Sequence, residues 1–128
     1  MLILPDGKLV FQRRTSDAAI SAHKLDFFGG HHEGHESDIE TAKRELSEET
    51  SLRVEHLRIR YVGRCKNPDT GTAMHLYIAH IKSPHFKVYE GEREEVYSLE
   101  EALKRSDIDP DTRVVLEKYE EQQNAKYH

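Results

Sequence analysis

Residues 29–52 read GGHHEGHESDIETAKRELSEETSL, and this stretch decides how the rest of the chain is interpreted. Its 24 positions carry seven acidic residues, three histidines and one arginine. Ser37 and Glu40 form a Ser-x-x-Glu capping box, which predicts that a helix begins here and continues to residue 52. Apolar side chains then recur at helical spacing, at Ile39, Ala42 and Leu46.

Three glutamates share one flank of this expected helix. At about 100° per residue, Glu45, Glu48 and Glu49 fall within an arc of about 100° beside the apolar stripe. Like charges at this spacing destabilise a helix by a few tenths of a kcal/mol per pair, and the helix dipole disfavours them near the C-terminal end. The flank is either a solvated acidic face or a site whose repulsion is relieved by a cation. A hard divalent ion such as Mg²⁺ suits these oxygen ligands.

The bulk composition limits the class of protein. A chain of 128 residues is expected to form a single domain, residues 1–128. Its net charge of −5 argues against a DNA-binding surface, which is more often basic. No apolar run approaches the roughly 20 residues of a membrane span, so we expect no membrane partner. Cys65 is the sole cysteine and is interpreted as an inert thiol of a cytoplasmic protein.

The remaining chain alternates strand and helix patterns. Apolar runs on either side of Pro5-Asp6-Gly7 predict a hairpin with a very short first strand. Residues 56–65 and 72–82 predict a second hairpin, and residues 85–99 predict short strands around a loop at Gly91. Helices are predicted over 98–105, with a Ser-x-x-Glu capping box, and over 109–122, with Pro in the first helical position. This order predicts an α+β fold, a mixed β-sheet with flanking helices.

The spacing of residues 30–52 resembles the Nudix box, G-x5-E-x7-R-E-U-x-E-E-x-G-U, in which U is apolar. The matching positions are Gly30, Glu36, Arg44, Glu45, Leu46, Glu48, Glu49 and Leu52. Ser51 stands where the box has glycine, which is expected to weaken the helix end without removing a ligand. The sequence KLDFFGGHHEGHES before the helix and YEGE at 89–92 also resemble MutT-type Nudix hydrolases. The resemblance implies the Nudix α/β/α sandwich.

The resemblance also implies the roles of individual residues. Glu45, Glu48 and Glu49 would be metal-binding carboxylates, with the Gly29 carbonyl and Glu90 as further ligands. Mg²⁺ is the expected cofactor, with Mn²⁺ as an alternative. Arg44 would orient a box glutamate through a salt bridge, and either Glu90 or Glu45 would be the general base. Substrate contacts are expected from Arg13, Arg14, Gly29 and Gly30, and Phe27, Tyr77 and Tyr89 either stack on a base or pack in the core.

The implied activity is hydrolysis of a phosphoric anhydride in a nucleoside diphosphate linked to another moiety. A nucleoside triphosphate, cleaved to a monophosphate and pyrophosphate, is the leading substrate. ADP-ribose or a nucleotide sugar is the alternative, for which Pro68 is a weak indication because NPDTG also reads as a turn. A nucleotide-sensing domain without turnover is the alternative of another class, and the complete set of box glutamates argues against it. The protein is expected to be a monomer or a homodimer.

Overall fold

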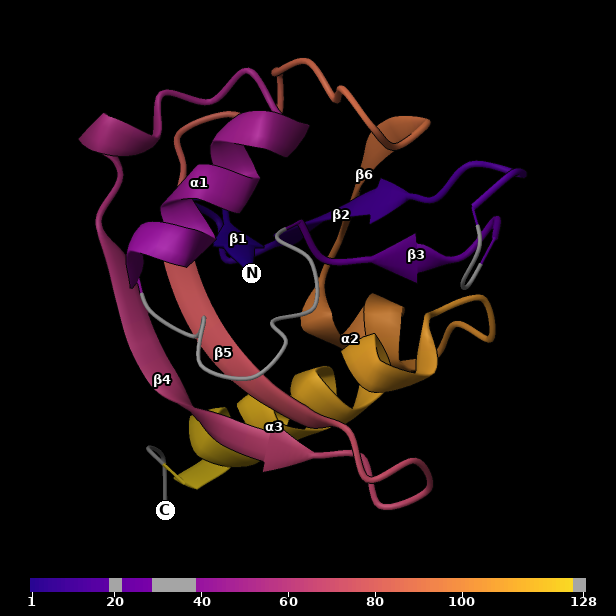
Figure 1. Ribbon diagram of the computed structural model, residues 1–128. Coiled ribbons are helices and arrows are strands. Elements are labelled where there is room, and N and C mark those ends of the chain that lie inside the picture. The colour runs from indigo at the N-terminus through magenta and orange to yellow at the C-terminus, as the bar shows by residue number, and fades with distance from the viewer. Residues whose placement is uncertain (19–21, 29–38, 126–128) are drawn as a thin grey trace.

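A computed structural model describes residues 1–18, 22–28 and 39–125 (Figure 1). The strands are β1 (Leu2–Ile3), β2 (Leu9–Arg13), β3 (Leu25–Asp26), β4 (Ile59–Lys66), β5 (Ala73–His80) and β6 (Arg93–Tyr97). The helices are α1 (Ile39–Glu49), α2 (Leu99–Leu103) and α3 (Pro110–Ala125), with a 3-10 turn η1 (Val54–His56) between α1 and β4.

The strands form one mixed sheet in the order β3-β2-β1-β5-β4, with β6 paired to β2. The short β1 joins the two halves, because it pairs antiparallel with β2 and parallel with β5. β4 and β5 form the long hairpin that the sequence predicts, with a register shift between Tyr61 and Gly63. β2 is the central strand of the other half, and all five of its residues are buried.

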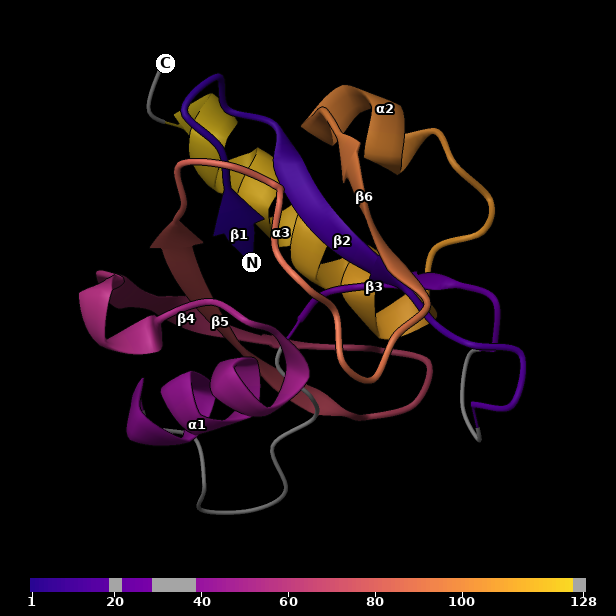
Figure 2. The same ribbon diagram turned by 90° about the horizontal axis from the view of Figure 1, so that it is seen from above.

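Helices cover both faces of the β4–β5 hairpin. In Figures 1 and 2, α1 lies on one side of these strands and α3 on the other. Two apolar clusters fill the layers. One packs Val115 and Leu116 of α3 against Leu76 and Ile78 of β5, and the other includes Leu46 of α1. The predicted sandwich of a mixed sheet between helices is confirmed, and its cause is burial of apolar side chains on both faces of the sheet.

Several local predictions are confirmed. The turn at residues 5–7 is closed by the Gly7 N–H, which donates to the Leu4 carbonyl at 2.9 Å. Ser98 and Glu101 form the capping box of α2. α3 begins at Pro110, and the carboxylate of Asp109 accepts from the Thr112 N–H at 3.1 Å.

Three local predictions are wrong. α1 ends at Glu49 rather than at residue 52, and the Ser51 N–H donates to the Lys87 carbonyl instead of back into the helix. His56 lies in the 3-10 turn rather than in a strand, because the His56 and Leu57 N–H groups bond back to Arg53 and Val54. Before Gly91 the chain makes a single bridge, Val88 with Thr50, instead of a strand. The capping box at Ser37 lies outside the described residues. Within the described part of the chain, no helix is long and apolar enough to cross a membrane.

Candidate functional site

The acidic flank of α1 is partly buried. Leu46 packs into the core and holds the helix against the sheet, while Glu45 beside it is half-buried with its Oε2 atom inside the protein. Glu48 is exposed, and its Oε1 lies 3.8 Å from Nη1 of Arg44, one helical turn earlier. The structure therefore places Arg44 beside a box glutamate. Glu36, another glutamate of the box, lies outside the described residues.

Ser51 follows the helix and exchanges two hydrogen bonds with Lys87. The Ser51 N–H donates to the Lys87 carbonyl at 3.0 Å, and the Lys87 N–H donates to the Ser51 hydroxyl at 2.8 Å. The second bond needs the serine side chain and would be lost with glycine. Serine in place of the glycine of the box thus adds a hydrogen bond between the helix end and the segment that leads to Glu90.

The segment carrying Glu90 is anchored on both sides. The Tyr89 N–H donates to the Glu49 carbonyl at 2.8 Å, and the Glu92 N–H donates to the Arg13 carbonyl at 2.8 Å. Glu90 is therefore held between the end of α1 and the end of β2. The structure brings together two carboxylate-bearing segments that are far apart in the sequence, as the interpretation of Glu90 requires.

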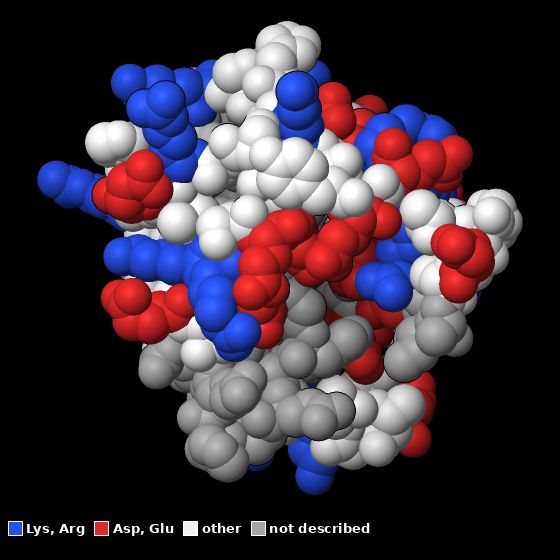
Figure 3. All heavy atoms as spheres, turned by 45° about the horizontal axis from the view of Figure 1, so that its top comes forward, with Lys and Arg blue, Asp and Glu red and all other residues white. Residues whose placement is uncertain are grey.

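A group of acidic side chains lies near the acidic flank of α1 on the surface. Figure 3 shows Asp and Glu atoms at the centre of the face on which α1 and the segment before β6 lie. Within the residues that the structure describes, no three Asp, Glu, His or Cys side chains converge on one point as a ready-made metal cage. Gly29 and Gly30, expected to contact metal or substrate, lie outside the described residues.

Arg13 has a structural role that differs from the expected phosphate contact. It is 9% exposed, and its guanidinium donates to both Glu95 oxygens at 2.7 and 2.8 Å, to Asp107 at 2.8 Å and to the His23 carbonyl at 2.9 Å. The bidentate bond to Glu95 raises the pKa of Arg13, and the same bond lowers the pKa of the Glu95 carboxyl. Every guanidinium nitrogen is engaged, so Arg13 is the centre of an ion-pair network, and its expected contact with substrate stays a prediction.

Arg14 lies at the edge of the site. Its side chain is 30% exposed, and its Nη1 lies 3.4 Å from Oδ2 of Asp26. Asp26 also accepts hydrogen bonds through Oδ1 from the Phe27 N–H and from the Thr112 hydroxyl, at 2.7 and 2.6 Å. The expected contact of Arg14 with substrate stays a prediction, and it would compete with this ion pair.

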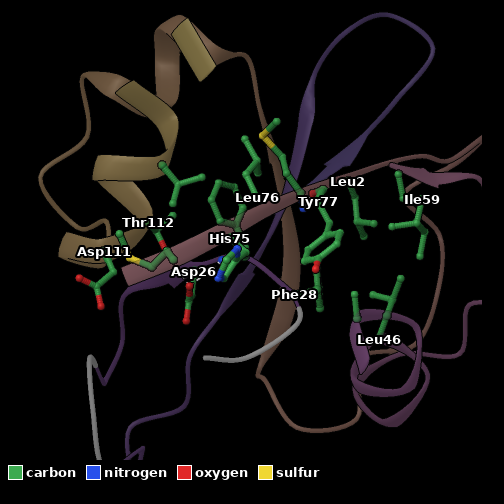
Figure 4. Close-up of a pocket in the computed structure, with 16 residues that line it drawn as sticks. Leu2, Asp26, Phe28, Leu46, Ile59, His75, Leu76, Tyr77, Asp111 and Thr112 are labelled. Atoms are coloured by element: carbon green, nitrogen blue, oxygen red, sulfur yellow. Dashed lines mark hydrogen bonds between the residues drawn. The ribbon is translucent and has the colours of Figure 1, made fainter. Parts of the chain in front are cut away.

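A pocket runs along β5 from α1 to α3 (Figure 4). Its volume is about 110 Å³, and α1 contributes Ala42 and Leu46 to its wall. Phe27 and Tyr77, two of the aromatic residues considered for base stacking, also line it, whereas Tyr89 is exposed elsewhere. Apolar and aromatic walls of this kind suit a flat organic group.

The acidic groups of the pocket lie at its α3 end. Figure 4 shows Asp26, Asp111 and Thr112 together at one end, with Leu46 and Ile59 at the other. Buried Asn67 donates to Asp111 Oδ1 at 2.8 Å and thereby orients that carboxylate. Sequence reasoning did not find these groups, because they come from β3, α3 and the β4–β5 turn. The only indication of them in the sequence was the position of Asp26 and Asp111 beside short apolar runs. Acidic residues in such positions are common on protein surfaces.

The site thus joins an acidic helix, an anchored fourth glutamate and an apolar pocket on a mixed sheet between helices. This is the arrangement of a phosphoanhydride hydrolase. The family described as NUDIX domain matches residues 1–119 of the chain. The chain belongs to this family, and the family and fold together identify it as a Nudix hydrolase that acts on phosphoric anhydrides.

Solved structures agree on the fold. DR0079 from Deinococcus radiodurans is 19% identical over 91% of this chain and 77% of its own, with a TM-score of 0.78. A MutT protein from Methanosarcina mazei Go1 is 21% identical over 96% and 90%, with a TM-score of 0.75. The E. coli ORF135 protein is 26% identical over 97% and 88%, with a TM-score of 0.67. A comparison with curated protein sequences gives no match.

Proposed function

We propose that this protein is a Mg²⁺-dependent pyrophosphohydrolase that converts a nucleoside triphosphate to a monophosphate and pyrophosphate. The observation that carries the proposal is the attachment of the Glu90 segment to the end of α1, through the Tyr89 N–H and the Glu49 carbonyl. It ties the segment that carries Glu90 to the end of the helix that carries Glu49, and the same helix lines a pocket that suits a base.

The donor set fits a hard divalent cation. Glu45, Glu48, Glu49 and Glu90 offer carboxylate oxygens, and Mg²⁺ is commonly held by one or two carboxylates with waters and substrate phosphates completing its shell. A preformed cage is therefore unnecessary, which agrees with the dispersed carboxylates of α1. Mn²⁺ is the alternative cofactor. When bound, the metal supplies neutralisation of the phosphate charge and polarisation of the attacking water.

The protein residues then have separate tasks. Glu49, whose carbonyl holds Tyr89, and its neighbours on α1 bind the cation. Arg44 restrains Glu48 across one helical turn. Glu90 or Glu45 accepts the proton of the attacking water, since both carboxylates lie on the segments that meet at the helix end. Removing such a base typically costs about 10²–10⁴-fold in rate.

The pocket beside α1 is proposed to take the nucleoside. Ala42 and Leu46 line the pocket, and the glutamates occupy the adjoining flank of the same helix. A nucleotide would therefore lie with its base in this pocket along β5 and its phosphates over the flank of α1. The described lining contains no Lys or Arg, so its chemistry suits a base better than a phosphate.

The YEGE loop, residues 89–92, favours triphosphates over ADP-ribose as the substrate. Hydrogen bonds of its Tyr89 and Glu92 N–H groups anchor this loop to the ends of α1 and β2. The residue that would favour ADP-ribose, Pro68, lies in the β4–β5 turn, where the Gly71 N–H donates to the Asn67 carbonyl at 2.8 Å. The turn accounts for this proline without a substrate contact.

The test is turnover of a nucleotide panel with Mg²⁺: dNTPs, oxidised dGTP, ADP-ribose, nucleotide sugars and diadenosine polyphosphates. We expect triphosphates to release pyrophosphate and a monophosphate. Faster release of AMP from ADP-ribose would move the assignment to the alternative substrate class. Nucleotide binding without turnover of any substrate would support the sensor interpretation instead.

A further inference from the structure

Gln12 is a buried polar side chain in the middle of β2. It is 5% exposed and follows three fully buried apolar residues, Leu9–Phe11. Its Nε2 donates to the Phe27 carbonyl at 2.9 Å. A buried amide is unfavourable unless it is hydrogen-bonded, so an apolar side chain would be the simpler choice for packing alone.

The carboxamide oxygen of Gln12 lies against Gly91. A Cβ atom at Gly91 would be 2.7 Å from Oε1 of Gln12 and 3.2 Å from the Arg13 carbonyl oxygen. The Gly91 φ is not in the left-handed region. Glycine is therefore needed at this position for close approach to Gln12 and not for the backbone conformation.

The two contacts of Gln12 belong to two segments of the candidate site. Phe27 is two residues before Gly29 in the sequence, and Gly91 directly follows Glu90. Gln12 pairs with Asp26 of β3 on one side and with Glu94 of β6 on the other, so its strand lies between the two segments. One side chain thus spans the approach to the box and the Glu90 segment.

We propose that Gln12 is a positioning residue that sets the distance of Glu90 from the helix carrying Glu45, Glu48 and Glu49. The Tyr89–Glu49 bond fixes one end of the Glu90 segment, and the Gly91–Gln12 contact, with the Glu92–Arg13 bond, fixes the other. This inference rests on the proposed function, because it assigns Gln12 a role through Glu90 and the metal.

If Gln12 only supports the fold, replacing it should lower stability and nothing else. If Gln12 positions Glu90, replacing it should also weaken metal binding and slow the reaction. The first test is Gln12→Met, which keeps the volume and removes the bond to Phe27. We expect kcat to fall about tenfold or more with KM changed less than about twofold, since misplacement by about 1 Å can cost 10²-fold. The rise in melting temperature on adding Mg²⁺ should also shrink. Gln123→Met, on α3, is the matched control.

The second test is a double-mutant cycle between Gly91→Ala and Gln12→Ala. Gly91→Ala alone drives its Cβ into Oε1 of Gln12 and should lower kcat and the Mg²⁺-induced rise in melting temperature. In the double variant the closest atom is gone and only the 3.2 Å contacts with the Arg13 carbonyl oxygen and Val88 Cγ1 remain, so Gly91→Ala should cost less kcat in the Gln12→Ala background than in the wild type. This non-additivity identifies direct contact between the two positions. The cycle also tests the inference if Gln12→Met does not fold.

Two results would overturn the inference. One is a folded Gln12→Met protein with the kcat and the Mg²⁺ response of the wild type. The other is additive loss in the double variant. If the wild type hydrolyses no substrate of the panel, the proposed function fails, but the Mg²⁺-induced shift in melting temperature of Gln12→Met and Gly91→Ala still decides the role of Gln12.

Discussion

The backbone N–H of Tyr89 donates to the carbonyl oxygen of Glu49 at 2.8 Å, and this bond joins the acidic helix to the segment that carries Glu90. A carbonyl in the last turn of a helix has no partner within the helix and must find one elsewhere. Here the partner comes from a distant part of the chain. The same bond that satisfies the end of α1 ties the segment carrying a fourth glutamate to the helix that carries the other three.

Glu90→Gln tests the role of this fourth glutamate. The change keeps the size of the side chain and removes its charge, so the Tyr89–Glu49 bond should persist. If Glu90 is the general base, kcat should fall by about 10²-fold or more at neutral pH. Glu100→Gln, on the exposed face of α2, is the matched control. A variant with full activity would leave Glu45 as the remaining candidate base.

The proposed role of the pocket in binding the base is tested by placing a larger side chain in its wall. Ala42 lines its wall on α1, so Ala42→Leu should raise KM for a nucleotide about tenfold by steric exclusion of the base. The Mg²⁺-induced rise in melting temperature should persist, because no carboxylate changes. Ala125→Leu, at the exposed end of α3, is the control. An unchanged KM in folded Ala42→Leu would place the base elsewhere.

Ser51→Ala tests the tie between α1 and Lys87. Loss of the hydroxyl leaves the Lys87 N–H without its bond at 2.8 Å, and we expect the free energy of unfolding to fall by about 1 kcal/mol. Denaturant unfolding measures this, with Ser106→Ala as the control. Ser51→Gly, which restores the common box residue, should also lose the bond, so a stability gain of that variant would contradict the account.

The Arg13 network predicts a pH dependence of stability. Bonds to Arg13 and Arg105 hold the pKa values of Glu95 and Asp107 below their ordinary values of 4.5 and 3.8. Stabilisation by depressed carboxyl pKa values is complete above the ordinary values and is lost as the pH falls through the folded-state values. The free energy of unfolding should therefore fall as the pH drops below about 4.5, toward the depressed values.

Arg13→Met is the matched variant for this pH dependence. It should lower the free energy of unfolding by about 2 kcal/mol at neutral pH, because it removes the bidentate bond to Glu95 and leaves that carboxylate with the more exposed Arg93 and the Tyr97 hydroxyl. Its stability should also depend less on pH between about 5 and 2 than that of the wild type. Equal pH profiles measured by denaturant unfolding would contradict the network as the source of the effect.

The sequence was sufficient for features that depend on local spacing. The apolar stripe of α1, the three glutamates beside it and the caps of α2 and α3 all follow from residues within one or two helical turns. The β4–β5 hairpin follows from alternation around a turn. These are patterns whose physical cause lies within a short window of chain.

Features that depend on contacts between distant residues could not be predicted. Arg13 follows an apolar run in the sequence, and only the fold brings Glu95 and Asp107 to its guanidinium. Gln12 reads as one polar residue after an apolar run, and its contact with Gly91 depends on the pairing of β2 with β6. The pocket combines residues from separate elements for the same reason.

The central claim is that the glutamates of α1 bind the metal that hydrolysis requires. The most direct measurement is turnover of the nucleotide panel with Mg²⁺ by the wild type, Glu49→Gln and the control Glu120→Gln, on the exposed face of α3. The account predicts that the wild type and the control hydrolyse one substrate class, while Glu49→Gln loses about 10²-fold or more in kcat and its Mg²⁺-induced rise in melting temperature. Wild-type activity and an undiminished Mg²⁺ response in Glu49→Gln would contradict it.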